Sequence, residues 1–200
     1  MNLDATFRPI VVVAFFTIIA IALPFRIKSQ STGEKLDRTQ EGIFTMIALR
    51  LAGLVLWGSV IAFMIRPASM KWSSLPLTAP LRWSGVALGV LTAALLIWTL
   101  RSLGKNLTDT VVTRQAHTLV TRGPYAWVRH PFYGCMLLFL SSTVLMTANW
   151  FVLAAGLIVF TILAARSKTE EEKLLERFGE PYRAYRASTG RFIPGVGRVA

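Results

Sequence analysis

The chain has 200 residues, of which 54% are hydrophobic and only 16% charged, and its formal net charge is +12. This composition exceeds the hydrophobicity of an ordinary soluble domain and predicts an integral membrane protein. The excess of Lys and Arg does not require nucleic acid, because basic loops stay on the cytoplasmic side and face anionic lipid there. We therefore expect anionic membrane lipids, and no nucleic acid, as partners.

Uncharged stretches predict the membrane spans in chain order. The first three lie at about 9–25, 43–65 and 83–100, and the second contains Arg50. Arg50 either extends toward the lipid headgroups or faces inward as a functional cation. The first stretch has the small residues of a signal-peptide cleavage site at Ala20 and Ala22, but Asp4 and a single Arg precede it, which favours a span.

Residues 131–165 contain no charged residue and no His. As one helix this run would be about 52 Å long, against a hydrocarbon core of about 30 Å, so it must fold back on itself. The sequence TANW at 147–150 is the natural turn. We therefore predict spans at about 131–148 and 150–165, whose hairpin brings the polar segments on either side of it to one face of the membrane.

Five spans place the two termini on opposite sides, and the basic residues predict which side each occupies. With the N-terminus outside, the inner segments 26–41, 101–130 and 166–200 hold 17 Lys or Arg, whereas the outer segments hold four. This asymmetry predicts a cytoplasmic C-terminus. Residues 1–200 form one predicted membrane domain, and Thr169 with the three Glu after it predicts the start of a short tail helix that ends at Gly179.

Several kinds of site are excluded by missing motifs. The chain has no GxGxxG or phosphate-binding P-loop, and two isolated His with no HExxH predict no zinc site. Three consecutive Glu at 170–172 point about 100° apart on a helix, so we expect no metal there. Gly85 and Gly89 form a GxxxG that favours helix packing.

The remaining polar residues flank the hairpin. His117, Tyr125, Arg129 and His130 precede it, while Arg166 and Glu170 follow it and share one helical face. An exposed ion pair and ordinary interfacial histidines would explain them, but together they also suit a small cofactor that carries a carboxylate and an amine.

At these residues the chain resembles the isoprenylcysteine carboxyl methyltransferase family. The matching segments are HTLVTRGPYAWVRHPFYG at 117–134 and RSKTEEEKLLERFGEPYRAY at 166–185, with the hairpin between them. The resemblance covers about the C-terminal half. It implies an all-α membrane enzyme that binds S-adenosylmethionine from the cytoplasm through segments 113–133 and 166–185, while a lipid-like or prenylated acceptor enters from the bilayer.

The resemblance also implies roles for individual residues. Arg166 would bind the acceptor carboxylate, Glu170 would act with it in catalysis, and a family Gln contact has Thr113 as its nearest candidate. The implied cofactor contacts are His117, Thr118, Leu119, Val120, Tyr125, His130, Pro131, Phe132, Tyr133 and Glu170.

The implied reaction fits the residues present. A methyl sulfonium is already electrophilic, so holding donor and acceptor in line and excluding water is the main requirement. An ionised carboxylate acceptor needs no general base, and Arg166 could orient it through two hydrogen bonds. Two alternatives remain open at this point: methylation of a phospholipid ethanolamine nitrogen, and a membrane scaffold without enzymatic activity.

Overall fold

The structure is a computed structural model that describes residues 3–30, 43–104 and 118–198. Over these residues the chain is helical, and its only extended pairings are two isolated bridges. The helices are α1 (Leu3–Gln30), α2 (Ile43–Ile65), α3 (Ala79–Leu103), α4 (Pro131–Thr147), α5 (Trp150–Phe178) and α6 (Glu180–Ser188), with the 3-10 helices η2 (Pro67–Ser73) and η4 (Gly123–Ala126). The predicted all-α class is confirmed.

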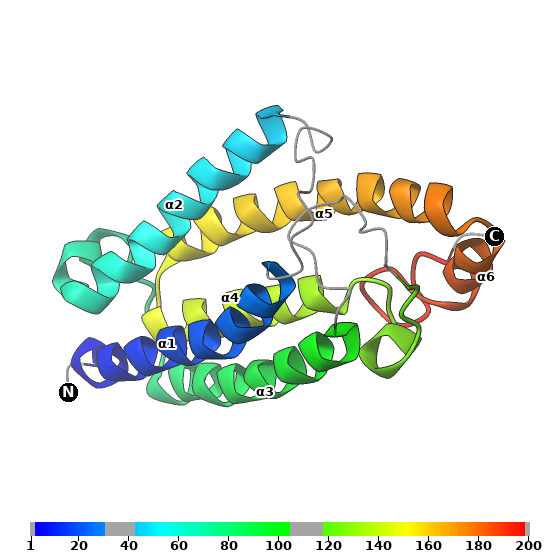
Figure 1. Ribbon diagram of the computed structural model, residues 1–200. Helices are drawn as coiled ribbons and strands as arrows, with labels where there is room; N and C mark the ends of the chain where they lie inside the picture. Colours follow the sequence, from blue (N-terminus) through cyan, green and yellow to red (C-terminus); the bar gives the residue numbers. More distant parts are fainter. Residues whose placement is uncertain (1–2, 31–42, 105–117, 199–200) are drawn as a thin grey trace.

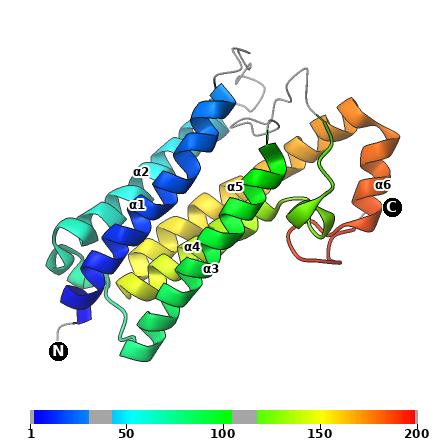
Figure 2. The same ribbon diagram turned by 60° about the horizontal axis from the view of Figure 1, so that its bottom comes forward.

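The long helices lie side by side in one bundle (Figures 1 and 2). Helix α3 packs along α4, and α2 packs along α5, while α4 and α5 also contact each other. Helix α6 and the C-terminus lie at the end of the bundle away from the N-terminus (Figure 1). The two segments that flank the predicted hairpin therefore meet at the C-terminal end.

Four helices, α1, α2, α3 and α5, have the length and hydropathy to cross a membrane, and α4 is a shorter apolar helix of 17 residues. Large apolar side chains are exposed along them, as expected for surfaces that face lipid. Helix α2 has the predicted bounds of 43–65, whereas α1 and α3 extend beyond their predicted spans. Arg50 is exposed on α2, so the inward-facing interpretation is not supported.

The turn between α4 and α5 lies where TANW predicts it. Helix α4 ends at Thr147, and Ala148 adopts a left-handed conformation with a φ of 48°. Asn149 then caps α5, because its side-chain oxygen accepts from the Val152 N–H at 3.1 Å. The Asn149 amide nitrogen also donates to the Met70 carbonyl and the Ser73 hydroxyl, which ties the turn to η2.

The predicted helix start at Thr169 is wrong, because α5 continues without a break from Trp150 to Phe178. No Gly or Pro occurs between Leu157 and Phe178, so nothing in this stretch interrupts the helix. The predicted end is confirmed: Gly179 has a φ of 57° and caps α5 before α6 begins. One rigid helix therefore runs from the apolar bundle to Arg166 and Glu170.

The opposite end of the bundle is joined by its own buried contacts. Arg82, in α3, donates to the Asp4 carboxylate at 2.8 Å and to the Met146 carbonyl at 2.6 and 3.0 Å. The GxxxG residues Gly85 and Gly89 face Ser142 of α4, whose hydroxyl donates to the Gly85 carbonyl at 2.8 Å. That motif is a packing surface between α3 and α4.

Candidate active site

The loop before α4 is shaped by a glycine and a proline. Gly123, at the start of η4, has a φ of 64°, a conformation that favours glycine. Pro131 occupies the first turn of α4, where its missing N–H leaves no helical hydrogen bond unmade. Between them, Val128, Arg129 and His130 are buried. These constraints direct the RHP segment, residues 129–131, toward the end of the bundle.

Glu171 is the buried carboxylate at this end. Its Oε1 accepts from Arg129 Nε at 2.9 Å and lies 3.0 Å from His130 Nε2. Arg191 Nε lies 3.6 Å from the same oxygen, and 10% of the Glu171 side chain is exposed. A carboxylate removed from water needs partners of this kind. The cluster joins α5 to the loop before α4 and to the C-terminal tail.

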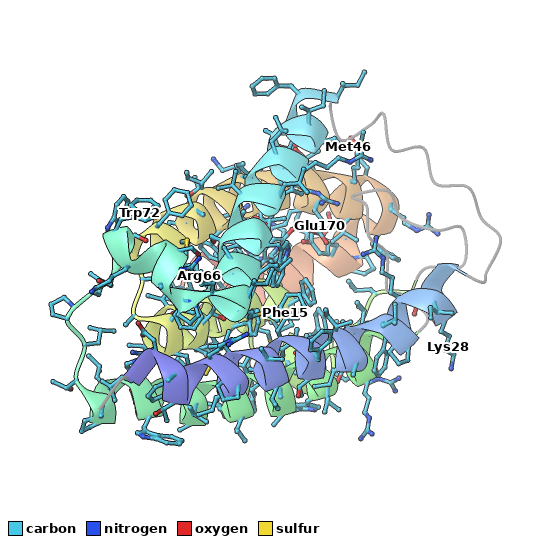
Figure 3. All side chains as sticks on the ribbon, turned by 90° about the vertical axis from the view of Figure 1, so that its left-hand side faces the viewer. Phe15, Lys28, Met46, Arg66, Trp72 and Glu170 are labelled. Carbon is cyan, nitrogen blue, oxygen red and sulfur yellow. The ribbon has the colours of Figure 1, made fainter. Side chains whose placement is uncertain are left out.

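Glu170 faces a different side of α5. Tyr133 donates its hydroxyl to Glu170 Oε2 at 3.2 Å, and His130 Nδ1 lies 3.8 Å from that oxygen. A third of the Glu170 side chain is exposed, at 33%. In Figure 3 Glu170 projects onto the middle of the bundle, whereas Trp72 and Lys28 lie at its rim. Glu170 thus retains oxygen atoms that a ligand can reach.

The C-terminal tail closes over the RHP segment. Arg129 donates to the carbonyls of Thr189 at 2.6 Å, Gly197 at 2.9 Å and Arg186 at 3.2 Å. The Arg129 and His130 backbone N–H groups donate to the carbonyls of Gly190 and Arg191. Four hydrogen bonds from two adjacent residues therefore fix this tail against the site, and a fifth, to the Arg186 carbonyl, fixes the end of α6.

Three buried tyrosines surround the cluster. Burial raises the pKa of Tyr185 to about 12, and burial followed by the nearby Glu170 charge raises the pKa of Tyr125 above its ordinary value. Burial likewise raises the pKa of Tyr182, with Glu171 adding to the shift. These phenols stay protonated near neutral pH. Tyr185 donates to the Tyr125 carbonyl at 2.6 Å, but the Tyr182 hydroxyl, although buried, has no hydrogen-bond partner in the part of the chain that the structure describes.

An apolar cavity of about 190 Å³ lies within the bundle, and its lining residues Met136, Val159 and Phe160 pack in one hydrophobic cluster with Tyr133. It is bounded by α1 to α5, and residues of the first turns of α4 contribute directly to its wall. The only side-chain heteroatoms among its lining residues come from Thr92, Thr143, Cys135, Met136 and Trp57. The cavity therefore suits a hydrocarbon chain far better than a charged group.

The structure brings together some of the predicted site residues. His130, Tyr133 and Glu170 are within the contacts given above, and Tyr125 is buried nearby. Phe132 lines the apolar cavity, and Arg166 is half-buried on α5 one turn before Glu170. The remaining described candidates, Thr118, Leu119 and Val120, form the segment leading into η4, followed after it by Pro131. His117 and Thr113 lie outside the described residues.

The sequence interpretation counted Arg129 among the polar residues that flank the hairpin but gave it no role, and it did not assign Glu171 or Arg191 to the site. A signal for Glu171 was present, because the buried positions Val159, Leu163, Ser167 and Glu171 of α5 recur every four residues. Extending the buried face of the last span would have selected Glu171 as the enclosed carboxylate. Arg191 carries no such signal, because its place depends on the path of the tail.

Comparison with known proteins agrees with the motif resemblance. Residues 85–176 match the isoprenylcysteine carboxyl methyltransferase family. Over 96 residues the chain is 31% identical to a protein-S-isoprenylcysteine O-methyltransferase of Dictyostelium discoideum, an alignment that covers 46% of this chain and 40% of that protein. The human protein of the same name is 37% identical over 99 residues, covering 46% of this chain and 35% of that protein.

Two further matches extend this comparison. A methanethiol S-methyltransferase of Pseudomonas deceptionensis is 34% identical over 74 residues, covering 37% of this chain and 28% of that protein. A solved eukaryotic intramembrane Ras methyltransferase, an isoprenylcysteine carboxyl methyltransferase, has a TM-score of 0.54 and 26% identity, covering 78% of this chain and 53% of that one. The predicted family resemblance is confirmed, and the chain is an integral membrane protein with that family's fold. Less than half of either isoprenylcysteine O-methyltransferase is covered.

Proposed function

We propose that this protein is an S-adenosylmethionine-dependent carboxyl O-methyltransferase that acts on an isoprenylcysteine-like or other lipid-like carboxylate. The observation that carries the proposal is that Tyr133 donates its hydroxyl to Glu170 and also packs in one hydrophobic cluster with Val159, which lines the apolar cavity. Tyr133 thus connects a carboxylate that suits a charged cofactor with space that suits a hydrocarbon chain. The similarity to the isoprenylcysteine O-methyltransferases supports the same assignment.

The residues at the site fit the cofactor. Glu170 offers accessible carboxylate oxygens for hydroxyl or amine donors, and the buried Tyr182 hydroxyl lacks a partner among the described residues. In this proposal the cofactor is held by His117, Thr118, Leu119, Val120, Tyr125, His130, Pro131, Phe132, Tyr133 and Glu170. When bound, S-adenosylmethionine supplies an electrophilic methyl group.

The chain's own residues then position and shield the acceptor. Arg166 is the proposed partner of the acceptor carboxylate, because its planar guanidinium can form two parallel hydrogen bonds. Glu170, one turn further along α5, would bind the methyl donor, S-adenosylmethionine. The tail that Arg129 anchors covers this end of the bundle and limits the access of water.

The proposed membrane arrangement has five spans in one domain, with the N-terminus outside and the active site facing the cytoplasm. Helix α4, with 17 residues, is at the lower limit of length for a span, and it lies between the longer α3 and α5. The excess of basic residues on the C-terminal side supports the orientation. Prenylated or other lipid-like acceptors would reach the cavity from the bilayer. Anionic lipids would contact the cytoplasmic side, where most of the Lys and Arg residues lie in this arrangement.

The direct test is methyl transfer from labelled S-adenosylmethionine to a prenylated cysteine by the purified protein. Glu170→Ala and His130→Ala should each weaken cofactor binding in calorimetry by about 1–3 kcal/mol, because each removes a polar contact from a desolvated site. Arg166→Ala should leave cofactor affinity unchanged and abolish turnover. Unchanged affinity in both of the first two variants would contradict the assignment.

A second candidate is S-methylation of a thiol, which the similarity to the methanethiol S-methyltransferase favours. The product separates the two reactions. Alkaline hydrolysis of a methyl ester releases methanol, whereas a thioether, or a methylated lipid amine, retains the label under the same conditions. Release of volatile label from the product is the result expected for the carboxyl reaction.

A further inference from the structure

We propose that Glu171 is a positioning residue: it holds the His130 imidazole with Nε2–H toward its own carboxylate and with Nδ1 toward Glu170 and the bound cofactor. The inference rests on the proposed function only for the identity of that cofactor. None of the motif-based site assignments includes Glu171, although it is the more deeply buried of the two carboxylates near His130, with 10% of its side chain exposed against 33% for Glu170.

The first step concerns which ring nitrogen carries the proton. Glu171 Oε1 accepts from Arg129 Nε at 2.9 Å and lies 3.6 Å from Arg191 Nε. A carboxylate between two guanidinium groups acts only as an acceptor. The His130 Nε2 atom 3.0 Å away must therefore be the donor of that hydrogen bond.

The second step concerns the orientation of the ring. The His130 ring packs against Tyr133 and Phe192, with centroid distances of 5.3 and 5.7 Å. Rotating the ring would break the hydrogen bond to Glu171 and disturb both aromatic contacts. Tyr133 of α4, Glu171 of α5 and Phe192 of the tail thus hold the ring in one orientation.

The third step concerns what the other nitrogen can do. His130 Nδ1 lies 3.8 Å from Glu170 Oε2, which is longer than a hydrogen bond. In the neutral imidazole that donates Nε2–H to Glu171, Nδ1 carries the lone pair, and it faces the same space as the accessible Glu170 oxygens. Both groups can then accept from hydroxyl or amine donors of one ligand. Glu171 would affect cofactor affinity through His130 without touching the cofactor.

The chain has two histidines, which makes the ring protonation directly measurable. In His117→Asn protein carrying ¹⁵N-labelled histidine, the imidazole nitrogen signals come from His130 alone. At a pH where the imidazole is neutral, we expect Nε2 to be protonated and Nδ1 to be unprotonated in the protein with Glu171 present. Glu171→Ala should produce a mixture of the two tautomers. The exposed neighbour provides the matched control, since Glu172→Gln removes the same charge one residue away and should change nothing.

Cofactor affinity, measured by calorimetry on the chain with both histidines, gives the second readout. Glu171→Ala should weaken S-adenosylmethionine binding about tenfold or more, the factor expected from one charge-assisted hydrogen bond. Glu171→Gln should recover much of this loss, because its amide oxygen still accepts from Nε2–H. If the alanine protein does not fold, Glu171→Met, which has a similar length but no acceptor oxygen, is the test variant.

Protonation of Nδ1 in the neutral imidazole with Glu171 present would overturn the positioning role. Identical tautomers and affinities in the Glu172→Gln protein and in the variant without an acceptor, Glu171→Ala or Glu171→Met, would overturn it as well. If the unsubstituted protein binds no S-adenosylmethionine while His130 shows the expected tautomer and responds to Glu171, the positioning role stands and the proposed function fails.

Discussion

The hydrogen bonds of Arg129 predict that one side chain controls the docking of the C-terminal tail. The Arg129 side chain is 2% exposed, and it donates to Glu171 and to the carbonyls of Arg186, Thr189 and Gly197. Arg129→Ala leaves these acceptors without that donor. Breaking a buried ion pair of this kind costs about 3–5 kcal/mol. Water that reaches the freed tail carbonyls offsets part of this cost, so we expect the tail to lose about 3 kcal/mol.

Hydrogen exchange followed by mass spectrometry measures this loss directly, because protection of backbone amides reports local opening. A loss of about 3 kcal/mol corresponds to a more than hundredfold fall in the protection of amides in residues 189–197. Arg129→Lys keeps the charge but not the planar fork, so its effect should be intermediate. The control is Arg183→Ala, because Arg183 is exposed on α6 and pairs with the exposed Glu180. Equal protection of the tail in the Arg129→Ala and Arg183→Ala proteins would refute the reasoning.

Three further predictions concern the cavity, the helix packing and the topology. Val159→Trp fills part of the 190 Å³ cavity and should raise KM for long-chain acceptors without changing cofactor affinity. Leu157→Trp, at an exposed position of α5, is the control and should leave this KM unchanged. Equal effects of the two substitutions on KM would argue against a chain-binding cavity. Gly85→Val should lower the free energy of unfolding by about 1–3 kcal/mol. The reason is that a Cβ at Gly85 would lie 2.7 Å from Leu145 Cβ and 3.0 Å from the Ser142 carbonyl oxygen. Thermal unfolding measures the change, and Gly53→Ala is the control because a Cβ at Gly53 would have nothing within 4 Å. A reporter fused after Ala200 should be active in the cytoplasm, and activity confined to the outer side would contradict the proposed orientation.

The apolar helices could be predicted because the bilayer imposes a simple rule on the sequence. Lengths without charge predicted all five apolar helices, and the length of the run 131–165 required the turn that the structure has at Ala148 and Asn149. The same rule could not predict where a helix ends beyond the uncharged run. Helix α5 continues through Arg166, Ser167 and Lys168 because these residue types are compatible with a helix interior.

The positions of the candidate site residues were predictable where a residue's neighbours along the chain determine its position. His130 and Tyr133 follow from the proline that starts α4, and Glu170 follows from its place on α5 after the hairpin. Glu170 Oε2 lies 3.2 Å from the Tyr133 hydroxyl and 3.8 Å from His130 Nδ1, and the hairpin between α4 and α5 is enough to bring these atoms together. The tail was not predictable in this way. Residues 189–197 reach the site through backbone hydrogen bonds to Arg129 and His130, which no periodic pattern encodes.

The division of roles between Glu170 and Glu171 follows from helix geometry together with the path of the tail. Adjacent residues on α5 point about 100° apart, so both carboxylates cannot face the same space. The residue on the buried face, Glu171, meets three cationic or donor side chains that enclose it, and one of them, Arg191, comes from the tail. Glu170 is then the carboxylate left with accessible oxygens. A motif with two adjacent Glu therefore supplies one residue that can bind a ligand and one that can hold the binding residues in place, and burial decides which is which.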